Sequence, residues 1–288
     1  MRGVNKSAKT RMIIFLVLAG ILCIACIFIK CFEPNDPNVA NLLMAKKAPC
    51  EQYPWGTDAL GRCIMSRVFD GAFISVFSAV LIVGLSMIIG CIIGMVSGYF
   101  GGKVDSIIMR ITDMFLAFPG MVLALAIAGI LGKGLTNAII ALVATNWTQY
   151  ARLSRSYVLT VKEENFIKAA KLDGHSSFSI MLKHVLPNTL RPIIVTASLS
   201  IGGALLSLAG LSFLGLGAQA PAAEWGSMLA DNRGLMQIAP WMVLYPGIAI
   251  FLVSILFNLM GDSVRDVLDP LDSNNVFKKQ SKKRRFAK

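Results

Sequence analysis

The chain has 288 residues, of which 55% are hydrophobic and only 15% are charged, and its mean hydropathy is +0.66. An ordinary soluble domain carries about 25% charged residues, so this composition excludes a typical soluble globular protein. The net charge of +12 could indicate a nucleic-acid partner, but the placement of the basic residues along the chain favours a role in membrane topology instead.

Charge-free hydrophobic blocks recur along the chain and are its main structural signal. A membrane-spanning helix needs roughly 20 mostly apolar residues, and six segments meet this requirement. We expect spans near residues 12–32, 74–98, 106–131, 135–152, 192–216 and 241–261. The sequence therefore predicts an all-α, polytopic membrane protein with six transmembrane helices.

The first hydrophobic block is predicted to be an uncleaved anchor rather than a secretory signal peptide. Four basic residues precede an uncharged run from Met12 to Ile29. This run is longer than the 7–15 residues of a usual signal-peptide core, and no A-x-A cleavage site follows it.

Lysine and arginine are distributed unevenly between the two sides of the predicted membrane. If the N-terminus lies inside, the inner segments hold 21 of the 28 basic residues and the outer segments hold 7. Because basic residues favour the cytoplasmic side, both termini are predicted to be cytoplasmic, in a multi-pass protein of the cytoplasmic membrane. The basic run at 278–285 is interpreted as a solvated tail near anionic lipid rather than a nucleic-acid site.

Three of the six cysteines fall within predicted spans, where cysteine acts as a small apolar residue. The other three, Cys31, Cys50 and Cys63, lie on the predicted outer side. An odd number there leaves at least one unpaired, and whether any two of them form a disulfide stays open.

Proline–glycine pairs and a polar cluster within the predicted spans are candidates for lining a path across the membrane. Pro119 and Pro246, each followed by glycine, interrupt the third and sixth predicted spans. Such breaks can free backbone groups to line a cavity, and kinks that serve helix packing are an equally good explanation. Asn146 and Gln149 lie late in the fourth span, where they are candidates to face the same path.

Ionisable residues bear on the energy source of any transport. An ion-coupled secondary transporter should carry acidic residues deep in its spans, and the clean spans here have none. Arg110 and Asp113 are three residues apart on a predicted helix, so they are expected to form a local ion pair near the inner interface. The secondary-transporter alternative is therefore disfavoured.

The chain carries no recognisable catalytic or metal-binding constellation. Its only histidines, His175 and His184, both fall in the loop between the fourth and fifth spans. An intramembrane hydrolase would lack the commonest catalytic base, and without a phosphate loop the chain is not expected to hydrolyse ATP. No catalytic residue, metal site or bound cofactor is predicted.

The loop segment Lys168–Asn188 is short, positively charged and predicted to form two helical pieces hinged on Gly174. Glycine suits the left-handed residue that ends a helix. Ser176 or Ser177 can cap the next helix, which Pro187 is expected to limit. A helix–glycine–helix element on the loop of a membrane protein indicates a docking site for another protein.

This segment resembles the EAA loop of permease subunits of ABC importers, which reads E-A-A, three residues, Gly, nine residues, a hydrophobe, any residue and Leu-Pro. The matching residues are Ala169, Ala170, Gly174, Leu186 and Pro187. Lys168 stands where the family usually has Glu, and His184 where it often has Ile. Lys168 thus reverses a charge on the docking surface, while the small alanine pair allows close approach of another protein.

Four further stretches extend the resemblance over nearly the whole chain, to the C-type permease of the dipeptide/oligopeptide/nickel subfamily. They are GTDALGRCIMSR at 56–67, in which Cys63 replaces an Asp, SGYFGGKVDSIIMRITDMFLAFPG at 97–120, LSFLGLGAQAP with EWGSML at 211–229, and FNLMGDSVRDVLDP at 257–270. The resemblance implies a type I ABC importer permease fold, a MetI-like core with one added N-terminal helix.

The resemblance also implies a division of the chain. Residues 1–70 would hold the cytoplasmic N-terminus, the first helix and an extracytoplasmic segment. Residues 71–265 would form the permease domain, with the coupling loop at about 163–188, and residues 266–288 a basic cytoplasmic tail.

The partners that the resemblance implies are a homologous permease subunit in a heterodimer, two ABC ATPase subunits, and an extracytoplasmic binding protein. The EAA-like loop would lie in a groove of an ATPase and couple ATP binding to opening of the membrane path. The resemblance leaves two cargoes open, and we favour di- or oligopeptides over nickel. Bare nickel normally seeks imidazole or thiolate ligands, so nickel would travel as a chelate.

Overall fold

The computed structural model describes residues 6–28 and 35–268, and every regular element in these two ranges is helical. The long helices are α1 (Lys6–Phe28), α2 (Ile64–Phe100), α5 (Leu135–Val161), α8 (Leu186–Phe213) and α10 (Trp241–Leu268). The shorter helices are α3 (Gly102–Leu116), α4 (Gly120–Leu131), α6 (Asn165–Leu172), α7 (Ser177–Ile180) and α9 (Trp225–Asn232). The all-α prediction is confirmed for this part of the chain.

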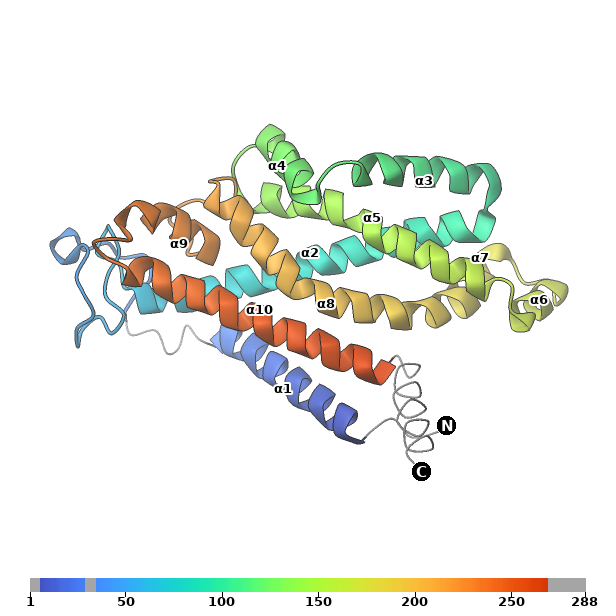
Figure 1. The fold of residues 1–288 in the computed structure, drawn as a ribbon, viewed down its shortest axis with the longest axis horizontal. Coiled ribbons are helices and arrows are strands. Elements are labelled where there is room, and N and C mark those ends of the chain that lie inside the picture. The colour runs from blue at the N-terminus through green and yellow to red at the C-terminus, as the bar shows by residue number, and fades with distance from the viewer. Residues whose placement is uncertain (1–5, 29–34, 269–288) are drawn as a thin grey trace, which may run out of the picture.

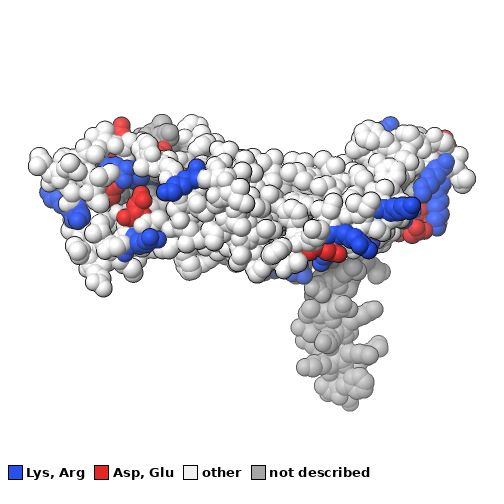
Figure 2. All heavy atoms as spheres, turned by 90° about the horizontal axis from the view of Figure 1, so that it is seen from above, with Lys and Arg blue, Asp and Glu red and all other residues white. Residues whose placement is uncertain are grey.

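The long helices lie along the long axis of the molecule, and α3 and α4 follow one edge of the bundle (Figure 1). The loop helices α6 and α7 lie at one end, and α9 lies at the other end together with the irregular segment 35–63. On the face shown in Figure 2, charged side chains gather towards the two ends and leave an uncharged band between them. This distribution suits a bundle that crosses a lipid bilayer.

Four helical stretches among the described residues are long and apolar enough to cross a membrane: Thr10–Phe28, Ile64–Phe100, Ser177–Phe213 and Trp241–Val267. Helices α3 and α4 make a fifth span if they are taken together, although they bend by 89° where they meet. Helix α5 is long enough, with 27 residues, but its polar side chains leave it less apolar than the others. The expected count of six is therefore not exact.

The two proline–glycine pairs behave differently. Pro119 directly precedes α4 and lies at the bend between α3 and α4, so the third predicted span is indeed broken there. Pro246 lies inside α10, which continues to Leu268, and the predicted interruption of the sixth span was wrong. Neighbouring helices and local adjustments accommodate proline within membrane helices, which explains the continuity of α10.

Helices α2 and α5 approach most closely along a row of glycines on α2. Gly90, Gly94 and Gly98 are spaced four apart, so they lie on one face of the helix. A Cβ atom at Gly94 would lie 2.2 Å from a backbone oxygen of α5, and one at Gly90 would lie 2.4 Å from another. The hydroxyl of Ser154 donates a hydrogen bond of 3.1 Å across this seam to the carbonyl of Cys91. Small residues therefore allow backbone contact between the two helices.

At the other end of the bundle, the segment 35–63 is organised around Asp58. Its carboxylate accepts a hydrogen bond of 2.7 Å from the guanidinium of Arg62. The guanidinium of Arg67 lies 3.7 Å from the same carboxylate. Trp55 stacks on Tyr245 of α10, with ring centroids 4.6 Å apart. These contacts attach the segment to α2 and α10.

Helix α9 is held in the bundle by the fully buried carboxylate of Glu224, which caps its N-terminus. The two carboxylate oxygens accept from the backbone N–H groups of Gly226 and Ser227, both at 2.9 Å. The hydroxyl of Ser75 on α2 donates to the same side chain at 3.4 Å. Burial raises the pKa of Glu224 above its ordinary value, and the backbone hydrogen bonds oppose this shift.

Five cysteines lie within the described residues, and all five are free thiols. Cys50 and Cys63 therefore form no disulfide with each other, and Cys31 lies outside the described residues.

At the far end of the bundle, Arg11 of α1 lies 3.5 Å from Asp266 of α10. The start of the first helix and the end of the last therefore lie on the same side.

Candidate functional site

The loop element from α6 to α7 has the predicted helix–glycine–helix form. Helix α6 ends at Leu172, and Gly174 follows in the left-handed region with φ of +79°. Ser176 then caps α7, and its hydroxyl accepts from the backbone N–H of Ser179 at 3.3 Å. The hinge and the serine cap are confirmed.

The helix does not end at Pro187, so the prediction that this proline limits it was wrong. A wider, π-helical turn at Met181–Val185 joins α7 to α8, and Pro187 is the second residue of α8. A wider turn of this kind directly precedes the proline, which has no N–H to donate to that turn. The loop element is therefore continuous with a membrane-spanning helix.

One face of the loop element packs into a small hydrophobic cluster of its own. Ile167 and Ala170 of α6 and Ile180 of α7 contact Met95 of α2 and Val158 of α5. Ala170 is thus buried, so it does not offer the close approach to another protein that the sequence predicted. The cluster instead attaches the loop element to both α2 and α5.

The opposite face of the loop element exposes large apolar side chains beside charged ones. Leu172 is 90% exposed, and Phe178 is 67% exposed. The other exposed residues of this face include Phe166, Lys168, Ala169, Gly174, Leu182 and Pro187, with His184 half-buried between them. Leu172 lies outside the candidate spans, and Phe178 lies in the first turn of one of them. Exposed large apolar side chains at the end of the bundle make this face the candidate docking surface.

Ion pairs connect α3 to α5 beside the loop element. Asp105 accepts from the Arg155 guanidinium through both carboxylate oxygens, at 2.5 and 2.6 Å. Asp113 pairs with Arg152 at 2.6 Å, so the expected local pair with Arg110 was wrong. Sequence spacing could not reveal these pairs, because their partners lie 39 and 50 residues apart along the chain.

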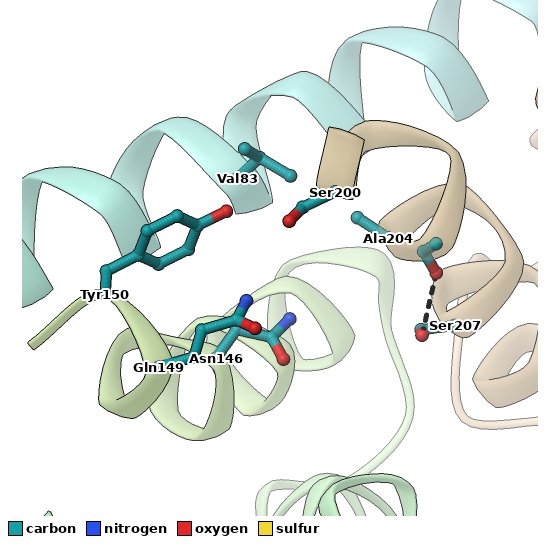
Figure 3. A pocket seen from close by; sticks show the side chains of 8 residues that line it. Val83, Asn146, Gln149, Tyr150, Ser200, Ala204 and Ser207 are labelled. Atoms are coloured by element: carbon teal, nitrogen blue, oxygen red, sulfur yellow. Dashed lines mark hydrogen bonds between the residues drawn. The ribbon is translucent and has the colours of Figure 1, made fainter. Parts of the chain in front are cut away.

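A polar pocket of about 210 Å³ lies between α2, α5 and α8 (Figure 3). The lining residues are Val83, Asn146, Gln149, Tyr150, Ser200, Gly203, Ala204 and Ser207. None of these residues is charged. Asn146 and Gln149 therefore face one cavity, whereas Pro119 and Pro246 do not line it.

Tyr150, Ser200 and Ser207 are pocket residues that sequence reasoning missed. The hydroxyl of Tyr150 points towards Ser200 in Figure 3. The three belong to helices α5 and α8, and only the packing of these helices brings them together. The one available signal was the spacing of Ser200 and Ser207, which lie seven residues apart and so share one helix face.

Within the described residues, no group of three His, Cys, Asp or Glu side chains lies close enough to hold a metal ion. The chemistry of this part of the chain is therefore that of helix packing, a neutral polar pocket and an apolar docking face.

Comparison with known proteins decides the family. Residues 90–271 match the family described as "Binding-protein-dependent transport system inner membrane component". This chain belongs to that family. It is a transport subunit rather than an enzyme, and a multi-pass protein of the cell membrane.

Curated relatives cover nearly the whole chain. The dipeptide transport system permease DppC of Alkalihalophilus pseudofirmus is 44% identical, over 88% of this chain and 86% of the relative. The probable D,D-dipeptide permease DdpC of Escherichia coli K12 is 40% identical, over 88% and 87%. The glutathione permease GsiD of Escherichia coli O6:K15:H31 is 42% identical, over 89% and 84%.

A solved structure shows the same fold. The chain matches a chain of the MetNI methionine ABC transporter in an inward-facing conformation, with a TM-score of 0.54 and 18% identity. The match covers 71% of this chain and 97% of the other.

Proposed function

We propose that this chain is a membrane-spanning subunit of an ATP-driven importer of di- and oligopeptides. The observation that carries the proposal is its 40–44% identity, over nearly its full length, to relatives named as permeases for dipeptides, D,D-dipeptides and glutathione. No feature of the described residues favours nickel as a second cargo.

The proposed importer contains a homologous permease as heterodimer partner, two ABC ATPases and an extracytoplasmic binding protein. Both termini and the loop element lie in the cytoplasm, in agreement with the excess of basic residues in these segments. The ATPases bind ATP, and this chain binds no cofactor of its own.

The loop element is proposed to couple the ATPases to the membrane helices. Its apolar face, with Leu172 and Phe178, docks in an ATPase groove. Its opposite face is packed on Met95 and Val158, so a movement of the loop is passed directly to α2 and α5. Because α7 continues into α8, the same movement reaches that helix.

The test of the function is peptide uptake by the complete importer in proteoliposomes. With binding protein outside and ATP inside, radiolabelled dialanine should accumulate, and an ion gradient without ATP should give no uptake. Uptake that follows a proton or sodium gradient and ignores ATP would refute the proposal in favour of a secondary transporter.

The docking face has a sharper test of its own. Leu172→Glu places a charge on a 90% exposed side chain, so it should leave the fold intact while it weakens ATPase copurification and lowers uptake. Gly174→Val forces a β-branched residue into a left-handed conformation and should also uncouple uptake. Leu43→Glu, at a 96% exposed leucine of the other end, is the matched control and should retain the ATPases. Normal ATPase binding by Leu172→Glu would remove this face from the interface.

A further inference from the structure

We infer that the pocket between α5 and α8 binds the main-chain amide groups of the transported peptide and not its side chains. The inference rests on the proposed function and identifies the part of the cargo that the membrane path recognises.

The first observation is a buried hydroxyl without a hydrogen bond. Tyr150 is fully buried, and its phenolic oxygen forms no hydrogen bond within the described residues, although it points towards Ser200 (Figure 3). A buried polar atom normally has a partner, and leaving one without a partner costs about 1–3 kcal/mol. Tyr150 lines the pocket, so a polar group of a bound ligand is the partner that would satisfy this hydroxyl.

The second observation is that the pocket supplies both donors and acceptors. Asn146 and Gln149 present side-chain amides into it. The hydroxyls of Ser200 and Ser207 donate to carbonyls of their own helix at 2.8 and 2.9 Å, so they face the pocket as acceptors. A peptide bond has one N–H donor and one carbonyl acceptor, and this lining can satisfy both.

The third observation is the absence of charge from the lining. A charged side chain in a pocket among membrane helices would need an opposite charge, and none lines this one. Arg152, two residues along α5 from Tyr150, does not line the pocket and forms an ion pair with Asp113 at 2.6 Å. The pocket thus suits the neutral group that all peptides share, and it does not discriminate among their side chains.

The test uses the complete importer in proteoliposomes and three probes: dialanine, alanyl-glutamate and alanyl-lysine. Tyr150→Phe removes only a hydroxyl that has no hydrogen bond, so the protein should still fold and its melting temperature should not fall. Gln149→Leu removes an exposed side-chain amide. Each variant should lower the uptake rate of all three peptides by a similar factor of about two- to tenfold, the effect expected for one lost hydrogen bond. Gln237→Leu, at an exposed glutamine outside the pocket, should transport normally.

Binding-protein-stimulated ATP hydrolysis, measured in the same vesicles, should persist in both variants, so that fewer peptides enter per ATP. Unchanged uptake in both variants would overturn the inference, and so would a loss confined to one of the three peptides. Failure of the wild-type importer to take up any of the three would instead refute the proposed function.

Discussion

Substitution of Gly94 by alanine should separate α2 from α5, because the backbones of the two helices touch at this point. The added Cβ atom would lie 2.2 Å from the carbonyl oxygen of Ala151, whereas ordinary contacts begin near 3.4 Å. Neither atom is the end of a flexible side chain, so the helices must move apart by about 1 Å.

The magnitude follows from what that movement breaks. A gap of about 0.5–1 Å forfeits about a quarter to a half of each dispersion contact along the seam. In a membrane such contacts supply most of the helix association, since lipid removes the hydrophobic driving force between helices. The movement also strains the 3.1 Å hydrogen bond from Ser154 to Cys91. Overpacking of this kind costs about 1–3 kcal/mol.

The assay is the melting temperature of the detergent-purified importer, followed by size-exclusion chromatography, together with peptide uptake. A loss of about 1–3 kcal/mol corresponds to a fall of about 2–12 °C. Gly84→Ala is the matched control on the same helix, because no atom lies within 4 Å of its added Cβ. If the melting temperature of Gly94→Ala equals that of the wild type, the close-packed seam is not what holds α2 to α5.

Three other outcomes are expected. Glu224→Ala should destabilise the importer by about 1–2 kcal/mol through loss of the α9 cap, and Glu224→Gln by less. Because burial raises the pKa of Glu224, wild type should gain stability over Glu224→Gln as the pH falls through that raised pKa towards 4.5; a flat pH profile would contradict this. Introduced cysteines near Gln52 and Gln219 should react from outside and one at Ser273, beyond the described residues, only from inside; external labelling at Ser273 would reverse the topology. The chain purified alone should hydrolyse no ATP, and measurable hydrolysis would overturn the assembly.

The earlier expectation for the alanine pair changes with the structure. A bulky side chain at Ala170 would have been a natural test of docking, but Ala170 is buried against Met95 and Val158. Ala170→Trp would therefore disturb the packing of the loop on its own bundle. Loss of transport in that variant would not distinguish a lost ATPase contact from disturbed packing within the bundle. The exposed Leu172 is therefore the better position.

Local signals in the sequence were sufficient for the helical class, the membrane setting and the loop element. Uncharged blocks reveal spans because the bilayer imposes its thickness on each helix separately. The glycine hinge and the Ser176 cap were also predictable, since each depends only on the backbone of neighbouring residues. The motif of the loop, together with four further stretches, was enough to indicate the family.

Contacts between distant segments decided the rest. The pairing of Asp105 with Arg155 and of Asp113 with Arg152 depends on how α3 lies against α5. The burial of Ala170 depends on the packing of α6 and α7 against α2 and α5 in one cluster. The pocket is lined by Gln149 of α5 together with serines of α8 that lie about 50 residues further along the chain. A sequence determines which side chains a helix carries, but only the packing of helices determines which of them face each other, because packing depends on shape along the whole interface.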